Sequence, residues 1–351
     1  MPSRNGASPG LLERLDKGAV ICAEGYLFEL ERRGYIQAGA FVPEVVLEHP
    51  EKVAELHREF VHAGSDVVEA FTYYGHREKL RVIGKEELLE PLNRNALKIA
   101  AEVADETGTL LAGNICNTNI WEPDDGKTHD MARAMFEEQV GWAVDAGADL
   151  IIGETFCWID EALAALEVIR AAGKPSVITF ALDADGLHDG GDGPTACKRL
   201  ADAGAGVVGL NCSRGPDTML PVIREIRAAV SCHVAALPVP YRTTPDVPTF
   251  QLLRDTDCNC IPDIGTFPTA LDPFTCNRYE VGEFTEAAYA MGVNYLGLCC
   301  GAGPHHVRAM AEALGRQPPA SRYSPDMSKH AYQGTDEKVS SYYKKLGKMY
   351  E

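Results

Sequence analysis

The sequence predicts an α/β fold: a (β/α)8 TIM barrel with a long loop between strands 7 and 8 and a C-terminal extension. Short β-rich runs alternate with helical patterns eight times along the 351 residues, and eight such units favour a closed barrel over an open sheet. Several helical segments end in Ala-Gly before the next run, where glycine accepts the left-handed C-cap conformation. No Gly-x-Gly-x-x-Gly follows the first run, which argues against a dinucleotide-binding fold.

The predicted strands are apolar runs spread over the whole chain. They cover residues 19–24, 66–71, 110–115, 149–154, 176–182, 207–212, 233–237 and 294–300. Between most of them apolar residues recur at helical spacing, for example in 161–172 at Leu163, Leu166 and Ile169. The Ala-Gly helix ends place their glycines at Gly64, Gly147, Gly173 and Gly204.

Two segments do not follow the repeat. Residues 239–278 form a long Pro-rich connection between the seventh and eighth runs, and long structured loops in barrels commonly serve a site or an interface. Beyond Gly315 the chain becomes polar and ends in a Tyr/Lys-rich helical pattern. We therefore expect a barrel domain over 1–315 and an extension over 316–351 that contacts another subunit.

Composition narrows the class of protein. With 51 acidic and 33 basic residues the net charge is −18, and such a charge repels phosphate backbones, so nucleic acid is not an expected partner. No apolar stretch reaches the roughly 20 residues that span a bilayer, so we expect no membrane segment. An odd number of cysteines, 11, and no secretory signal pattern favour reduced thiols in a cytoplasmic protein. The expected substrate is small.

Three cysteines stand where predicted strands end. Cys212 ends the sixth run, and Cys299 and Cys300 end the eighth. Strand neighbours point to opposite faces, so two adjacent cysteines share an ion only where the strand breaks, and Gly301 begins such a break. Three thiols at strand ends are typical of a zinc site with one open position. The alternative is that they are small buried hydrophobic residues, as most free cysteines are; Cys258-x-Cys260 lacks the second pair of a zinc finger.

Acidic and aromatic residues also mark the strand ends. One interpretation of Glu24 and Glu154 is that each caps the next helix or pairs with a lysine. The other is that both face one cavity, where two carboxylates would hold an ammonium group. The aromatic side chains either belong to the core or present ring faces to a quaternary ammonium ion. These aromatic residues are Phe41, Phe71, Tyr73, Tyr74, Phe156 and Trp158.

These residues resemble a known family. Gly209-Leu210-Asn211-Cys212 together with Gly297-Leu298-Cys299-Cys300-Gly301 looks like the paired zinc signature of the homocysteine S-methyltransferases, which are zinc-bearing (β/α)8 barrels. Further segments resemble the betaine-homocysteine S-methyltransferase branch, and the likeness runs from about residue 11 to about residue 330. These segments are 30–35, 48–51, 56–60, 63–65, 71–74 and 318–321.

The resemblance implies a reaction. Homocysteine would fill the open zinc position as a thiolate and take a methyl group from an onium donor, giving methionine. With glycine betaine as the donor, the leaving group is dimethylglycine. Other donors in the family are S-methylmethionine, dimethylsulfoniopropionate or another betaine. A zinc hydrolase fits three thiolates less well, since hydrolase sites favour His and carboxylate ligands, and a metal-storage or scaffold role is the remaining alternative.

The resemblance also implies roles for residues. Cys212, Cys299 and Cys300 match the zinc ligands, Glu154 matches the acid that holds the homocysteine amine, and Asn211 precedes a ligand that it would orient. Tyr74 matches a donor-pocket tyrosine. The other residues expected to contact substrate are Gly25, Phe41, Phe71, Thr72, Tyr73, Thr155 and Phe156.

This chain differs from the family at some of the positions that are expected to bind substrate. The family usually reads Asp-Gly-Gly where this chain has Ala23-Glu24-Gly25, so Glu24 stands one position after the missing Asp. Thr155 replaces a tyrosine of the betaine branch, and Phe41 replaces a tryptophan. Residues 316–330 resemble a part that reaches a neighbouring subunit, so we expect a homo-oligomer, most simply a dimer. His330 would then lie near a partner's donor pocket, or it is a solvated tail residue.

Overall fold

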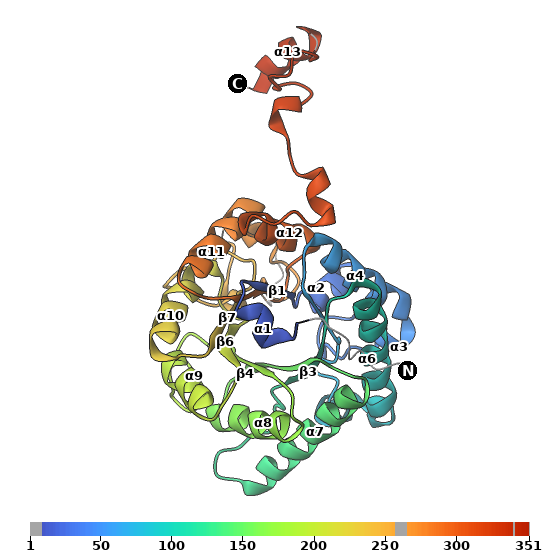
Figure 1. Ribbon diagram of the computed structural model, residues 1–351, viewed down its shortest axis with the longest axis vertical. Helices are drawn as coiled ribbons and strands as arrows, with labels where there is room; N and C mark the ends of the chain where they lie inside the picture. Colours follow the sequence, from blue (N-terminus) through green and yellow to red (C-terminus); the bar gives the residue numbers. More distant parts are fainter. Residues whose placement is uncertain (1–8, 257–264, 340, 351) are drawn as a thin grey trace.

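The barrel is closed by parallel strands in chain order. The computed structural model describes residues 9–256, 265–339 and 341–350, and within them eight strands pair each with the next while β8 pairs with β1 (Figure 1). This confirms the predicted fold class. The strands are β1 Val20–Ala23, β2 Val67–Glu69, β3 Leu110–Cys116, β4 Leu150–Phe156, β5 Ser176–Phe180, β6 Val207–Asn211, β7 His233–Leu237 and β8 Tyr295–Leu298.

Helices surround the barrel, as Figure 1 shows. They are α1 Leu11–Leu15, α2 Tyr26–Arg32, α3 Val45–Glu48, α4 Pro50–Ala63, α5 Arg77–Ile83, α6 Leu89–Thr107, α7 Gly126–Asp145, α8 Ile159–Ala171, α9 Gly193–Asp202, α10 Pro216–Ala229, α11 Arg278–Ala290, α12 Pro304–Ala313 and α13 Ser341–Gly347. Shorter 3-10 helices are η1 Glu86–Leu88, η2 Phe250–Leu252, η3 Asp272–Phe274, η4 Pro319–Tyr323, η5 Met327–Lys329 and η6 Lys348–Tyr350.

The predicted glycine helix ends are confirmed. Gly64, Gly147, Gly173 and Gly204 have φ of 119°, 82°, 69° and 94°. A side chain with a Cβ rarely adopts this left-handed conformation, so glycine ends each helix and turns the chain toward the next strand.

Side chains of the strands alternate between two hydrophobic clusters. One cluster fills the barrel and includes Val20, Leu110, Leu150 and Val207, together with Leu11 and Leu15 of α1. The other lies between strands and helices and includes Ile21, Leu111, Ile151 and Val208. Because both faces of every strand are buried, the strands read as continuous apolar runs. Helix α1 lies across the centre of the barrel in Figure 1 and closes the end where the strands begin.

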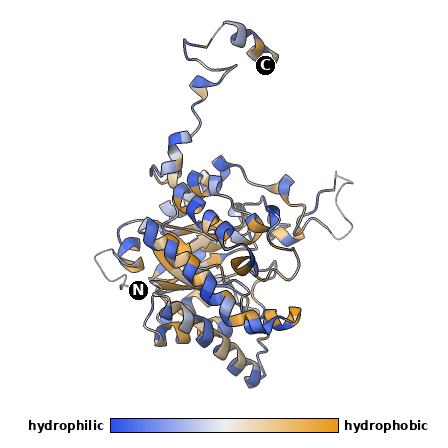
Figure 2. Ribbon diagram, turned by 90° about the vertical axis from the view of Figure 1, so that its right-hand side faces the viewer, coloured by the Kyte–Doolittle hydropathy of each residue, from blue (hydrophilic) through white to orange (hydrophobic). Residues whose placement is uncertain are grey.

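The two segments outside the repeat are present as predicted. The connection from β7 to β8 carries η2, η3 and α11; Cys258 and Cys260 lie outside the described residues. After α12, Arg316 forms an ion pair with Asp66 (2.6 Å), and Arg308 of α12 donates to the carbonyl of Ala320 in η4 (3.5 Å). The rest of the extension projects away from the barrel (Figures 1 and 2). Among the described helices, none has the length and apolarity needed to cross a bilayer.

Candidate active site at the carboxyl ends of the strands

Three thiols meet where β6 and β8 end. The Sγ atoms of Cys212, Cys299 and Cys300 all lie within 4.8 Å of one another, and those of Cys299 and Cys300 are 3.9 Å apart. Cys212 and Ser213 have φ of 57° and 54°, a conformation that is costly for residues with a Cβ and that persists where the surrounding structure imposes it. This backbone turn directs the Cys212 thiol toward the other two.

The thiol cluster has the chemistry of a metal site. Hydrogen bonds from Cys299 and Cys300 hold the pKa of Cys212 well below its usual range, while the pKa values of the two donors are raised. A tetrahedral zinc ion with Zn–S bonds of about 2.3 Å separates its sulfur ligands by about 3.8 Å, which agrees with the spacing of Cys299 and Cys300. These side chains fit a zinc ion.

Contacts from two other elements fix the loop after Cys300. Arg32 of α2 donates to the Tyr241 hydroxyl (2.8 Å) and to the carbonyl of Gly301 (3.3 Å). Gly301 has φ of 92°, and a Cβ there would lie 2.2 Å from the Tyr241 hydroxyl. Similarly, a Cβ on Gly25 would lie 2.1 Å from the carbonyl oxygen of Ala302. Both glycines allow the loop to pack against its supports.

Beside the thiols, three buried carboxylates are linked by two asparagine amides. Asn114 Nδ2 donates to Glu69 Oε1 (2.6 Å) and to Glu154 Oε1 (2.7 Å). Asn211 Nδ2 donates to Glu154 Oε2 (2.8 Å) and, at 3.4 Å, to Glu24 Oε2. Asn211 is itself held, because its Oδ1 accepts from the Thr155 backbone (3.0 Å) and the Thr179 hydroxyl (2.9 Å).

Burial disfavours the charged form of each carboxylate. It raises the pKa of Glu154 to about 8, an effect that Cys212 reinforces and the amides of Asn114 and Asn211 oppose. Burial and the proximity of Glu154 raise the pKa values of Glu24 and Glu69 well above their usual range. Close, buried acidic groups of this kind are typical of functional sites.

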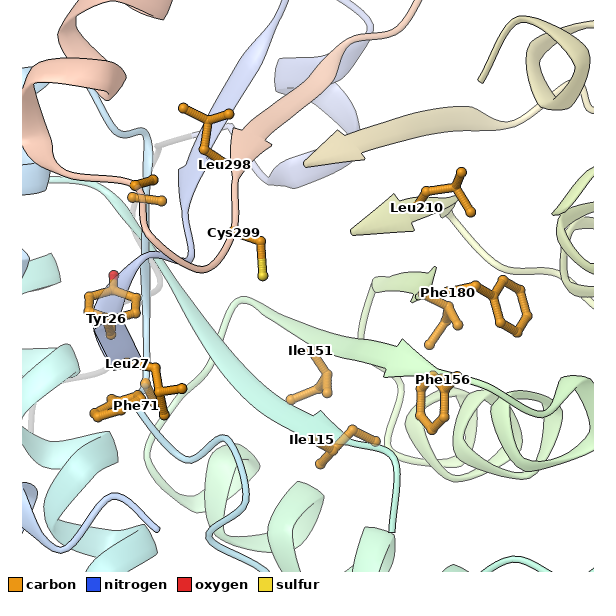
Figure 3. Close-up of a cluster of buried hydrophobic side chains, with 14 of the residues drawn as sticks. Tyr26, Leu27, Phe71, Ile115, Ile151, Phe156, Phe180, Leu210, Leu298 and Cys299 are labelled. Carbon is orange, nitrogen blue, oxygen red and sulfur yellow. The ribbon is translucent and has the colours of Figure 1, made fainter. Parts of the chain in front are cut away.

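A cavity connects the carboxylates with two of the thiols, those of Cys299 and Cys300. Figure 3 shows the sulfur of Cys299 pointing toward the middle of the barrel. The lining side chains combine three acids with aromatic and apolar groups. They are Glu24, Tyr26, Leu27, Glu69, Ala70, Phe71, Tyr73, Asn114, Glu154, Thr155, Cys299 and Cys300.

Part of the predicted aromatic cluster borders this cavity. Phe71 and Tyr73 line it, and the Tyr73 hydroxyl accepts from Thr155 Oγ1 (3.4 Å). Tyr74 lies next to Tyr73, with ring centroids 4.2 Å apart, and the ammonium of Lys79 lies 3.8 Å from the centre of the Tyr74 ring. Tyr74 and Thr155 both have φ of 57°, so strained backbone recurs around the site.

The other predicted contact residues have different surroundings. The Thr72 hydroxyl donates to the carbonyl of Asn114 (2.8 Å) and so joins the ends of β2 and β3. Phe156 is fully buried in the outer cluster against Phe136 (Figure 3 shows its position at the end of β4). Phe41, with φ of 55°, packs on Phe28, and Trp158 contacts His188.

Sequence reasoning missed Glu69 and Asn114. Both lie inside strands, not after them. The alternation Leu110, Ala112, Asn114 places Asn114 on the face that fills the barrel, and Val67 and Glu69 are related in the same way. Polar residues at inward positions near a strand end were the signal that could have found them.

The fold and this site define a class: a (β/α)8 barrel enzyme whose site, at the carboxyl ends of the strands, combines three thiols with buried acids. The family described as homocysteine S-methyltransferase matches residues 21–314. Betaine–homocysteine S-methyltransferase 1 of Danio rerio is 36% identical over 317 residues, which are 89% of this chain and 77% of that protein. The chain therefore belongs to the homocysteine S-methyltransferase family and is a methyltransferase.

Two further similarities add detail. The S-methylmethionine–homocysteine S-methyltransferase BHMT2 of Pongo abelii is 35% identical over 90% of this chain and 85% of its own length. The metallated form of the homocysteine methyltransferase MmuM from Escherichia coli superposes with a TM-score of 0.65 at 20% identity, covering 85% of this chain and 98% of that one. The structural match shows the shared fold, and the two curated relatives use different donors at nearly equal identity.

Proposed function

We propose that this methyltransferase transfers a methyl group from glycine betaine to homocysteine, giving dimethylglycine and methionine. The observation that supports it most is one cavity that joins Cys299 and Cys300, two members of the three-thiol cluster, to buried carboxylates. A thiol acceptor with an ammonium group matches both ends of that cavity. The acceptor sulfur attacks the methyl carbon, the sulfur–carbon bond forms, and the electron pair of the breaking nitrogen–carbon bond stays on the leaving amine.

Cys212, Cys299 and Cys300 would hold a zinc ion, since the spacing of their sulfur atoms suits one. A bound zinc ion would favour the thiolate form of the acceptor. Asn211 supports this arrangement, because its amide lies 3.8 Å from the Cys299 sulfur and bonds Glu154 on the other side. The thiol and carboxylate halves of the site are thereby kept in a fixed relation.

Glu154 and Glu24 would bind the acceptor's amine. Glu24 points into the barrel, as Cys22 does, whereas Ala23 belongs to the outer cluster. Because strand side chains alternate, the residue after the position of the family's Asp is the one that lines the cavity here. This alternation supports Glu24 as the replacement.

The donor would lie against the aromatic side. Phe71 and Tyr73 offer ring faces in the cavity, and rings attract onium ions. S-methylmethionine is the second candidate donor: a relative that uses it is as similar as those that use betaine, and Thr155 and Phe41 replace two aromatic residues of the betaine branch.

A donor panel tests the proposal. Zinc-loaded protein is incubated with homocysteine and one donor at a time, namely glycine betaine, S-methylmethionine or dimethylsulfoniopropionate, and methionine is measured. We expect the highest kcat/KM with glycine betaine. Turnover with S-methylmethionine alone would change the donor assignment. No methionine with any onium donor would overturn the function.

The extension over 316–351 would contact a second subunit of a homo-oligomer. It carries exposed aromatic and sulfur side chains at Tyr323, Met327 and Tyr342. Within one chain, His330 accepts from the backbone of Tyr332 (3.3 Å) and Gln333 (3.1 Å). Truncation after Ser324 retains the Arg316 ion pair and η4, and should reduce association in light scattering; an unchanged oligomer would contradict the assignment.

We also propose a cytoplasmic location. The described cysteines are free thiols, including half-buried Cys157 and Cys232, which suits a reducing compartment.

A further inference from the structure

Glu69 is a buried acid that the proposed function leaves without a task. It ends β2, is 2% exposed and lines the cavity. Its carboxylate, that of Glu24 and the thiol of Cys22 lie within 4.8 Å of one another. In the part of the chain that the structure describes, Glu24 Oε1 is buried and has no hydrogen-bond partner.

Among the described residues around the cavity, none carries a positive charge to match these acids. Its described lining holds Glu24, Glu69 and Glu154 but no Lys, Arg or His. A buried carboxylate without a cation is costly. Such an arrangement is explained when a cationic group of a ligand completes it.

The two asparagine amides fix the three acids as a group. Asn114 joins Glu69 to Glu154, and Asn211 joins Glu154 to Glu24. A primary ammonium has three N–H donors, one for each carboxylate. A quaternary ammonium or sulfonium ion has none, so this geometry distinguishes the acceptor's amine from the donor's cation.

We propose that Glu69 completes, with Glu24 and Glu154, a three-carboxylate subsite for the acceptor's primary ammonium group, and that Glu69 makes the enzyme selective for thiols that carry this group. The proposal rests on the proposed function and adds a specificity-determining residue to it. Glu69 touches the substrate's amine, at the end of the substrate opposite the reacting sulfur.

The substitution Glu69→Gln removes the carboxylate charge and keeps the size of the side chain. Glu69 Oε1 accepts from Asn114, and a glutamine carbonyl in the same place keeps this bond. We expect the homocysteine KM to rise about 10- to 100-fold, since a hydrogen bond to a charged group is lost. The donor KM and kcat should change little. The kcat/KM preference for homocysteine over its amine-free analogue 4-sulfanylbutanoate should fall by the same factor.

A matched control and a conservative variant complete the experiment. Glu161 is also buried, but it accepts from the backbone and hydroxyl of Thr118 and is not among the described residues that line the cavity. Glu161→Gln should leave the acceptor preference unchanged. Glu69→Asp keeps the charge at a shorter reach and should retain part of the preference, which is informative even if Glu69→Gln folds poorly by thermal unfolding.

The outcomes separate the two proposals. If the wild-type protein forms methionine and Glu69→Gln keeps its acceptor preference, the role of Glu69 is refuted and the function stands. A Glu69→Gln protein that loses kcat but keeps the preference refutes it as well, because that result indicates a structural role. If the wild-type protein does not methylate homocysteine, the proposed function fails, and this inference fails with it.

Discussion

The same strands build two unlike layers inside the barrel. In the lower layer, near the strand starts, the inward side chains are apolar, such as Leu110, Leu150 and Val207, and α1 covers them. In the upper layer, a few residues further along the strands, the inward side chains are polar, such as Asn114 and Glu154. Inward position alone therefore does not decide between core and site; the distance along the strand does.

The two layers have opposite effects on the stability of the fold. A fully buried leucine stabilises the fold by roughly 1.5–3 kcal/mol, and the lower layer includes Leu110 and Leu150. The upper layer buries three acids whose pKa values are raised by desolvation. It also includes strained backbone at Cys212 and Thr155. The lower layer thus stabilises the barrel. The buried acids and strained backbone of the upper layer lower the stability of the fold, as is common where residues are arranged for function.

The largest expected effect is on the thiols of the upper layer. Cys212→Ser, Cys299→Ser or Cys300→Ser should each abolish bound zinc and methyl transfer, because three thiolates are needed to hold the ion. Metal content by atomic absorption and methionine formation are the measurements. Cys232→Ser is the control, since Cys232 is half-buried and free. Full zinc content and turnover in any of the three variants would refute the assignment.

The second effect is on the lower layer, where stability should change and chemistry should not. Leu150 is fully buried in the interior cluster, so Leu150→Ala should lower the free energy of unfolding by about 2–5 kcal/mol. The homocysteine KM of the folded fraction should stay near that of the wild type. Denaturant unfolding and steady-state kinetics measure the two. A large KM change with little loss of stability would contradict the division into layers.

Much of the lower layer, but less of the upper one, could be predicted from the sequence. Apolar runs and glycine caps are local signals, so the eight strands and the ends at Gly147 and Gly173 were predicted correctly. Which acid meets which amide depends on barrel closure: Asn211 and Glu24 are 187 residues apart in the chain. Glu69 was missed because only the aromatic residues at the end of the second run were singled out as site residues, although alternation from Val67 places Glu69 inside the barrel.

The third effect concerns the acids. Both oxygens of Glu154 accept from asparagine amides. Glu154→Gln therefore removes the carboxylate and also places the NH2 group of the glutamine against the NH2 group of one asparagine, where no hydrogen bond can form. We expect the homocysteine KM to rise about 10- to 100-fold, with a much smaller change in the donor KM. Glu24→Ala should act in the same direction if Glu24 replaces the missing Asp. An unchanged homocysteine KM in Glu24→Ala would show that Glu24 does not bind the amine.

The smallest effect is expected at the aromatic edge of the upper layer. A cation over a ring is worth about 0.5–2 kcal/mol, so Tyr74→Ala should raise the donor KM by about 2- to 30-fold. Tyr74→Phe should cost little, because the ring remains. If Tyr74→Phe is as damaging as Tyr74→Ala, the hydroxyl matters more than the ring face.

Lys79 sharpens this last test, because its ammonium already lies over the Tyr74 ring. If the onium donor binds the same face of the ring, Lys79 competes with it. Lys79→Met should then lower the donor KM in the wild-type background, where Tyr74 is present, but not in the Tyr74→Ala background. The double-mutant comparison separates competition from a general loss of charge near the site. A donor KM that rises in Lys79→Met would instead mean that Lys79 attracts the donor's carboxylate, and the ring face would then not be the donor's binding surface.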